Sequence, residues 1–226
     1  MLTVACYLWG WEYSTKDVYL LKRMVDRHLT VPHEFVCLTD EPHRFDTDEI
    51  RVVELPEPPS GKMFCWQKLT TFHPDAERMI GKRILALDLD AVIVGEMDSL
   101  VNRPEPLVLW RNPSRRPWNA WSPRALYNSS MVLIKAGACP EVWERRHEGT
   151  LFPGDQDWVS WMVGPKCAYW DDSHGVYRLG REDTPGSGVD GVLPDNARVV
   201  FFPGSEGKPT LPAVVNRCPW IAEHRV

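Results

Sequence analysis

The feature that most constrains this chain is an aliphatic run that ends in two carboxylates. In RILALDLD, residues 83–90, the apolar residues lead directly into Asp88 and Asp90, and the chain then resumes with Val92-Ile93-Val94. Removing an unpaired charge from water costs a large free energy, so each carboxylate needs a compensating partner. That partner is a metal ion, a lysine or arginine, or water at the end of the strand.

Strand-like and helix-like segments alternate along the first half of the chain. Near-continuous apolar strands alternating with helices predict an α/β fold with a mixed, mainly parallel sheet. The predicted strands there are 2–9, 33–40, 50–55 and 83–90, with helices at 14–29 and 63–72. In the second half we predict strands at 107–110, 131–137, 167–170 and 197–202, and helices at 140–150 and 155–163.

Length and composition limit the classes of protein that this chain can belong to. Its 226 residues fit one domain, and a net charge of −5 argues against general nucleic-acid binding, which needs cations to replace phosphate counterions. The six cysteines include no C-x-x-C pair, which suits a reducing compartment. The start MLTVACYLWGW reads as a strand rather than a leader, and no apolar run reaches membrane-spanning length. We therefore expect a cytoplasmic protein without a transmembrane segment.

The aspartate pair is placed where α/β proteins bind ligands, at the carboxyl end of a strand. Side chains two residues apart on an extended segment point the same way, so Asp88 and Asp90 can hold one Mg²⁺ or Mn²⁺ that bridges a substrate phosphate. A turn with solvated aspartates is the plain alternative. A phosphatase of the haloacid-dehalogenase type is another, because DLDAV fits its motif, with Asp88 as nucleophile.

Five motifs, taken in order, resemble the GT-A fold glycosyltransferases, most closely the retaining enzymes of family 8. They are CWQKLTTF, RILALDLDAVIVGEMDSL, YNSSMVLIKAG, GDQDWVSW and VVFFPGSEGKPT, and together they span most of residues 2–210. The resemblance implies transfer of a sugar from a nucleotide diphosphate donor, a UDP-sugar above all, to a glycan, lipid-linked sugar or small molecule. It also implies a retaining reaction that depends on Mn²⁺ or Mg²⁺.

The same resemblance assigns roles to individual residues. Asp88 and Asp90 would hold the metal, Asp155 and Gln156 would lie beside the reacting carbon of the sugar, and the remaining residues would bind the donor. These donor-binding positions are Leu8, Trp9 and Tyr13 for the nucleotide base, Asn128 and Ser129 for the sugar, and Lys68 and Lys208 for the diphosphate. The expected organisation is one domain over 1–226, with a nucleotide-binding half (1–100), a donor-sugar and acceptor half (101–212) and a tail (213–226).

One position departs from the family pattern. The late motif usually supplies a metal-binding histidine, and this chain has Phe201-Phe202 there, which cannot ligate a cation. Asp88 and Asp90 with phosphate and water can suffice for Mg²⁺, or His174 can substitute. A third possibility is a nucleotide-sugar-binding relative with weak or absent catalysis. The Arg- and Trp-rich loop 111–124 is the expected acceptor side.

Overall fold

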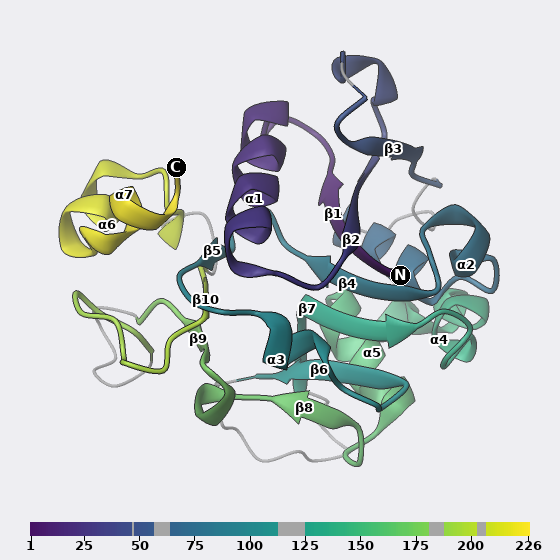
Figure 1. Ribbon diagram of the computed structural model, residues 1–226. Coiled ribbons are helices and arrows are strands. Elements are labelled where there is room, and N and C mark those ends of the chain that lie inside the picture. The colour runs from purple at the N-terminus through teal and green to yellow at the C-terminus, as the bar shows by residue number, and fades with distance from the viewer. Residues whose placement is uncertain (47, 57–63, 113–124, 181–187, 203–206) are drawn as a thin grey trace.

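The computed structural model describes residues 1–46, 48–56, 64–112, 125–180, 188–202 and 207–226 (Figure 1). The strands are β1 (Leu2–Leu8), β2 (His33–Thr39), β3 (Arg51–Glu54), β4 (Arg83–Leu87), β5 (Val92–Ile93), β6 (Leu107–Arg111), β7 (Tyr127–Lys135), β8 (Ala168–Trp170), β9 (Val176–Arg178) and β10 (Val199–Phe201). The α-helices are α1 (Thr15–His28), α2 (Ala76–Met79), α3 (Asp98–Val101), α4 (Glu141–Glu144), α5 (Asp155–Val163), α6 (Pro212–Arg217) and α7 (Trp220–His224). Four 3₁₀ helices are η1 (Pro42–Arg44), η2 (Phe64–Phe72), η3 (Arg146–Leu151) and η4 (Asp172–His174).

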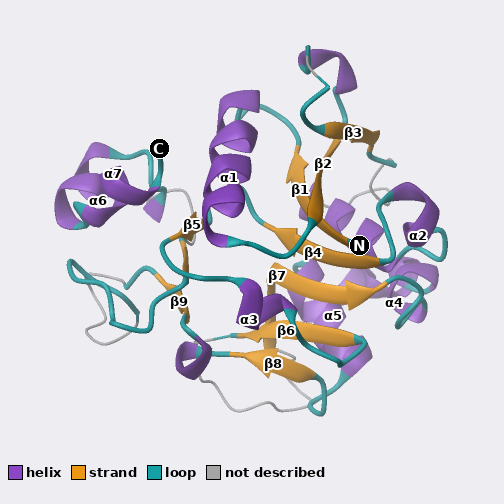
Figure 2. Ribbon diagram, viewed as in Figure 1, coloured by secondary structure: helices purple, strands orange, loops and turns teal. Residues whose placement is uncertain are grey.

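A seven-stranded sheet in the order β3-β2-β1-β4-β7-β6-β8 forms the centre of the molecule (Figure 2). Neighbouring strands from β3 through β4 are parallel, and β7 runs antiparallel to both β4 and β6. A smaller sheet, β5-β10-β9, stands beside it. The predicted α/β architecture with a mixed, mainly parallel sheet is therefore confirmed.

Both faces of the large sheet are covered, which explains its continuous apolar strands. On β1, Val4 and Cys6 face a core shared with α1, the small sheet and the C-terminal helices, whereas Ala5 and Tyr7 face a core shared with η2, α4 and α5. Figure 1 shows α1 on one side of β1, with α6 and α7 beyond β5. Helix α1 follows its predicted pattern, because its buried residues recur at helical spacing.

Several elements differ from the sequence-based prediction. The strand predicted over 83–90 ends at Leu87, and the predicted tail 213–226 contains most of α6 and all of α7. The helix predicted over 63–72 is the 3₁₀ helix η2, and His73 N–H still donates to the Thr70 carbonyl three residues back. The helix predicted over 140–150 divides into α4 and η3. Strand β7 begins at Tyr127 rather than at residue 131, because its polar first residues pair with the end of β6.

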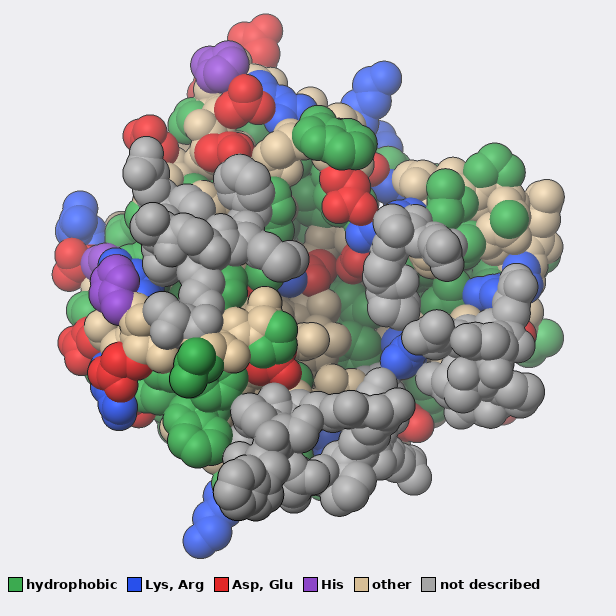
Figure 3. Space-filling view, turned by 180° about the vertical axis from the view of Figure 1, so that it is seen from behind, with side chains coloured by type: hydrophobic (Ala, Val, Ile, Leu, Met, Phe, Trp, Pro, Cys, Tyr) green, Lys and Arg blue, Asp and Glu red, His purple; other side chains and the backbone are tan. Residues whose placement is uncertain are grey.

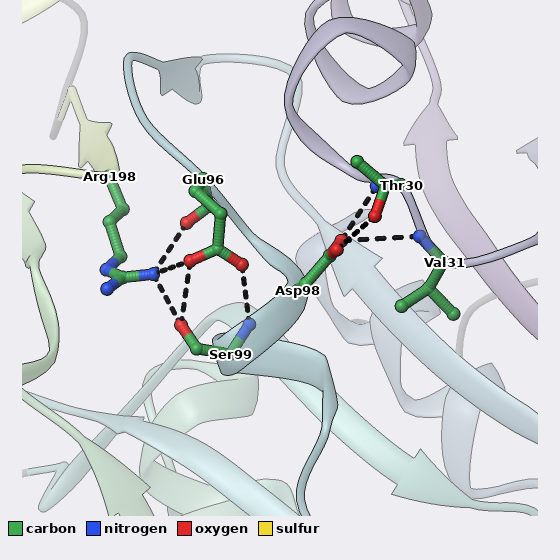
Figure 4. Close-up of polar contacts among 6 residues, drawn as sticks. All are labelled: Thr30, Val31, Glu96, Asp98, Ser99 and Arg198. Atoms are coloured by element: carbon green, nitrogen blue, oxygen red, sulfur yellow. Dashed lines mark hydrogen bonds and ion pairs between the residues drawn. The ribbon is translucent and has the colours of Figure 1, made fainter.

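Polar contacts around α3 tie the two sheets to α1 (Figure 4). Asp98 accepts hydrogen bonds from the backbone N–H groups of Thr30 (2.7 Å) and Val31 (3.3 Å), which follow α1. Arg198, just before β10, donates to the Glu96 carbonyl (2.9 Å) and to its carboxylate. These contacts join the segment after β5 to the end of α1 on one side and to the small sheet on the other.

No helix in the described part of the chain has both the length and the apolar character needed to cross a bilayer. All six cysteines fall within the described residues and are free thiols. Cys6, Cys37 and Cys218 are buried, where a thiol packs as a small hydrophobic group.

Candidate active site

The aspartate pair lies immediately after β4, at the edge of the sheet where the parallel strands end. The Asp88 N–H donates to the Ser130 carbonyl on β7 (3.0 Å), and the Ala91 N–H donates back to the Asp88 carbonyl (3.2 Å). This turn stops β4 at Leu87, three residues before the end of the predicted strand 83–90, so Asp88 and Asp90 lie in a turn at the rim rather than on an extended segment. A buried strand on each side holds the turn in place.

Lys68, from η2, forms a two-point ion pair with the first aspartate. Its Nζ lies 2.6 Å from Asp88 Oδ1 and 2.7 Å from Oδ2. Burial by itself would lower the pKa of Lys68, but the carboxylates of Asp88, Asp155 and Asp90 hold that pKa above its ordinary value. The lysine is therefore a fixed positive charge at the centre of the site.

The second aspartate meets a lysine from the far end of the chain. Lys208 Nζ lies 3.4 Å from Asp90 Oδ2 and 3.4 Å from Glu12 Oε1, and 4.8 Å from the centre of the Tyr13 ring. The pKa of Asp90 is raised to about 7. Burial is the largest cause and repulsion from Asp88 acts in the same direction, whereas Lys208 and Lys68 lower the pKa. Asp90 Oδ1 is buried and accepts no hydrogen bond within the described residues.

Asp155 brings a third carboxylate to the site from the first turn of α5. Its side chain is only 4% exposed. Burial raises its pKa, while Lys68 and a hydrogen bond from the Ser129 hydroxyl lower it. Its Oδ2 has no hydrogen-bond partner within the described part of the chain. A buried carboxylate oxygen without a partner is costly in the free protein, so this atom is suited to accept a hydrogen bond from a ligand.

Helix α5 is positioned by tryptophan packing below the site. Trp158 donates its indole N–H to the Val142 carbonyl (2.8 Å) and stacks on Trp66 of η2, with ring centroids 6.5 Å apart. Trp66 is 1% exposed and belongs to the core. Asp157 accepts a hydrogen bond from the Ala125 N–H (3.0 Å), a contact that holds the start of α5 against the chain before β7. The same aromatic stack therefore supports both Lys68 and Asp155.

A small pocket of about 60 Å³ opens beside Asp90. Its lining residues are Asp90, Trp110, Asn112, Asn128, Ser130, Arg178, Phe201 and Phe202. A register shift between Leu109 and Trp110 pairs Trp110 with Asn128, and such bulges redirect side chains near sites. The Trp110 ring stacks on Phe201 at 4.7 Å. Trp110, Ser130 and Arg178 were not predicted, because strand pairing brings them here and no local motif marks them, whereas Asn112 belongs to the predicted acceptor loop 111–124.

The predicted residues divide into those at the site and those beside it. The structure gathers most of them through direct contacts or the pocket lining: Asp88, Asp90, Lys68, Asn128, Ser129, Asp155, Lys208 and Tyr13. Gln156 follows Asp155 on α5 and is half-buried. Leu8 is fully buried in the core, and Trp9 packs near the Tyr7 ring at 6.1 Å, so neither side chain forms the site's polar surface.

The position of the missing histidine is apolar. Phe201 is 3% exposed and Phe202 is fully buried. His174 contacts Asp171 at 2.9 Å, and no group of three His, Cys, Asp or Glu side chains able to hold a metal forms among the described residues. Of the predicted acceptor loop 111–124, residues 113–124 lie outside the described residues.

Seen from behind, charges of both signs gather near the middle of the face. Figure 3 shows acidic and basic side chains meeting in a hollow there, with apolar and neutral atoms around them. Such mixed polarity is typical of a site for a charged, polar ligand rather than for an apolar one.

Comparison with known proteins identifies the fold of this chain but does not assign the chain to a family. No family model and no curated protein matches the sequence. Among solved structures, the apo form of the glycosyltransferase GlyE from Streptococcus pneumoniae TIGR4 is similar with a TM-score of 0.63 at 14% identity. The match covers 93% of this chain but 56% of GlyE, so this chain spans little more than half of that protein.

The galactosyltransferase LgtC is similar over nearly its full length. In complex with donor and acceptor sugar analogues it gives a TM-score of 0.59 at 13% identity, covering 94% of this chain and 91% of LgtC. An active-site mutant of LgtC gives 0.61 at 12% identity, with 98% and 94% covered. The fold is the GT-A glycosyltransferase fold.

The GT-A fold removes the basis of the phosphatase alternative. In the phosphatases the nucleophilic aspartate usually follows the first strand, whereas Asp88 follows β4, between β1 and β7 in the sheet. An Asp88 nucleophile is therefore not supported by this structure.

Proposed function

We propose that this chain is a glycosyltransferase that moves a sugar from a nucleotide diphosphate donor to an acceptor hydroxyl. The observation that carries the proposal is a pair of buried carboxylate oxygens, Asp90 Oδ1 and Asp155 Oδ2, that have no hydrogen-bond partner among the residues the structure describes. Both carboxylates lie close enough to Lys68 to raise its pKa, at the end of the sheet where α/β proteins bind ligands. A charged ligand with hydroxyl groups, such as a sugar diphosphate, would satisfy both.

The charge balance of the site favours a divalent cation. Four carboxyl groups (Asp88, Asp90, Asp155 and Glu12) lie beside two lysines (Lys68 and Lys208), so a diphosphate would add negative charge to a site that already holds more acidic than basic groups. Asp88 and Asp90 offer the hard oxygen ligands that Mg²⁺ and Mn²⁺ prefer, and Mg²⁺ is commonly held by one or two carboxylates plus substrate phosphates. The unpartnered Asp90 Oδ1 fits such an ion. When bound, the ion would neutralise the leaving diphosphate.

The chain's own residues account for the other parts of the reaction. Lys208 and Lys68 would stabilise the negative charge that builds on the diphosphate as the glycosidic bond breaks. Asp155 would accept a hydrogen bond from a sugar hydroxyl through Oδ2, and Gln156 would lie beside the positively charged sugar carbon. Retention follows if the acceptor hydroxyl attacks on the face that the diphosphate leaves, where a phosphate oxygen can take its proton.

UDP-sugars are the donors to test first. The solved LgtC complex contains donor and acceptor sugar analogues, and LgtC is a galactosyltransferase. In this chain, Asn128 and Ser129 would contact the donor sugar, and the end of β1 with Trp9 and Tyr13 would receive the base. The pocket beside Asp90 adds Trp110 and Asn112 on the acceptor side. The acceptor class is a glycan, a lipid-linked sugar or a small hydroxylated molecule.

A second candidate function is that of a nucleotide-sugar-binding protein with little turnover. It is favoured by Phe201 and Phe202, which fill the position of the usual third metal ligand. Such a protein would bind UDP but would not release it from a UDP-sugar.

The experiment that separates these functions measures UDP release. Purified protein is incubated with UDP-galactose, UDP-glucose and other UDP-sugars, with Mn²⁺, Mg²⁺ or EDTA. If the chain is a glycosyltransferase, we expect slow, metal-dependent hydrolysis of at least one UDP-sugar, and we expect Asp90→Asn to abolish it. UDP binding without hydrolysis of any donor would favour the second candidate, and the absence of both would overturn the proposed function.

A further inference from the structure

Lys208 is enclosed by two carboxylates and an aromatic ring, although it lies on the segment expected to meet the diphosphate. Its Nζ is 3.4 Å from both Asp90 and Glu12 and 4.8 Å from the Tyr13 ring centre, and its side chain is 15% exposed. Any phosphate that approaches this ammonium therefore also approaches Glu12.

Glu12 differs from the other carboxylates of the site in its environment. Its side chain is 54% exposed, and it lies in the loop between β1 and α1, outside the Asp88–Asp90 turn. Under the proposed function, the charges of Asp88 and Asp90 are offset by a cation. Glu12 lies outside that turn, so under the proposed function its carboxylate faces the ligand without a compensating partner once Lys208 turns to phosphate.

We propose that Glu12 is a specificity-determining residue that weakens binding of the product nucleoside diphosphate more than binding of the sugar donor. This inference rests on the proposed function and concerns the same site. The electrostatic reason is the difference in ligand charge. In the donor, each phosphate is a diester with one negative charge, whereas the terminal phosphate of the product is a monoester with about −1.5 to −2 at neutral pH.

Transfer of the sugar therefore adds negative charge at the diphosphate at the moment when the product must leave. The sugar–oxygen bond breaks, its electron pair remains on the terminal phosphate, and the new charge lies beside Lys208 and Glu12. Repulsion from Glu12 opposes Lys208 and favours release. Without Glu12, Lys208 would hold the product more tightly, and product release would limit turnover more strongly.

The test compares Glu12→Gln with the unaltered protein across ligands of increasing charge: uridine, UDP-galactose and UDP, each with Mg²⁺. The matched control is Glu41→Gln, an exposed carboxylate nearby that pairs with Arg44 (2.9 Å) rather than with a site lysine. Calorimetry at low and high salt gives the dissociation constants. An exposed charge pair typically changes affinity about twofold to fivefold, and salt screens that effect.

We expect Glu12→Gln to leave uridine affinity unchanged, to tighten UDP-galactose slightly and to tighten UDP about twofold to fivefold, with the gain lost in high salt. Glu41→Gln should change none of the three. Equal tightening of UDP and UDP-galactose, no change, or weaker UDP binding would each overturn the inference; weaker binding would make Glu12 a ligand contact. If the unaltered protein binds neither nucleotide, the proposed function fails instead.

Discussion

Lys68 Nζ lies 2.6 Å from one oxygen of Asp88 and 2.7 Å from the other, so a single lysine neutralises the first aspartate of the pair. This contact joins η2 to the turn after β4, and it answers the question that the sequence raises. In the free protein the charges beside the core strand are balanced by two lysines. A divalent cation would join them only when a diphosphate adds further negative charge.

Replacing Lys68 by methionine should destabilise the protein by about 3 kcal/mol, because it leaves a largely buried carboxylate without its partner. Thermal or urea unfolding measures the change. The double variant Lys68→Met with Asp88→Asn should recover much of the loss. Lys82→Met, at an exposed lysine 3.7 Å from Glu77, is the matched control and should change stability by less than about 0.5 kcal/mol. Equal losses of stability in Lys68→Met and Lys82→Met would refute the conclusion that Lys68 is the stabilising partner of Asp88.

Asp155→Asn should separate stability from activity. Burial raises the pKa of this carboxyl group, so a neutral amide of the same shape removes a desolvation cost, and the variant should unfold at the same or a higher temperature. Donor hydrolysis should fall at least about a hundredfold, the scale seen when an electrostatic contact to a transition state is removed. Asp157→Asn is the comparison variant for stability and activity, because the Asp157 carboxylate accepts a hydrogen bond from the Ala125 N–H within the fold. An Asp155→Asn variant that is less stable but still hydrolyses the donor would contradict the proposed role of Asp155 at the sugar.

Gly149→Ala should perturb the aromatic support of the site. A Cβ added at Gly149 would lie 2.4 Å from the Trp66 ring and 3.1 Å from the Trp158 ring. Overpacking of this kind typically costs about 1–3 kcal/mol. Because those rings support η2 and α5, we expect a lower unfolding temperature together with weaker UDP binding. Unchanged stability would show that the stack can move aside freely.

Two histidines should make the docking of the C-terminal helix sensitive to acid. His28 on α1 and His224 on α7 have ring centres 6.3 Å apart. Burial lowers the pKa of both; Arg27 lowers both further, and Glu223 opposes the shift at His224. The unfolded chain then takes up protons more readily than the folded one, so stability falls as the pH drops through about 6.5.

The pH dependence is checked by unfolding temperatures at pH 5.5 and 8. His28→Gln should reduce the difference between the two temperatures, and His147→Gln, at an exposed histidine of η3, should leave it unchanged. Identical differences in all three proteins would rule out the His28–His224 contact as the source.

Local signals were sufficient for elements whose pattern is contained in their own sequence. The spacing of Val18, Leu21 and Val25 predicted α1, and the apolar run before Asp88 predicted β4 as a strand buried within the sheet. The resemblance placed Lys68 and Lys208 near the aspartates, and the structure brings them into contact.

Other features depend on pairing between distant segments, which no local pattern records. Trp110 reaches the pocket through a register shift against Asn128, and Glu12 meets Lys208 only after the two ends of the chain come together. The ring of Tyr13, which is expected to receive the base, also lies 4.8 Å from the Lys208 ammonium, a contact that no local pattern predicts. The 3₁₀ form of η2 likewise reflects its packing and its ion pair rather than its helix propensity.

The most direct test of the central claim is calorimetric titration of UDP into the protein with Mn²⁺, with EDTA, and into Asp90→Asn with Mn²⁺. A cation held by the aspartate pair predicts binding with Mn²⁺ that weakens at least tenfold in EDTA and to the same extent in Asp90→Asn. Equal UDP affinity under all three conditions would contradict it.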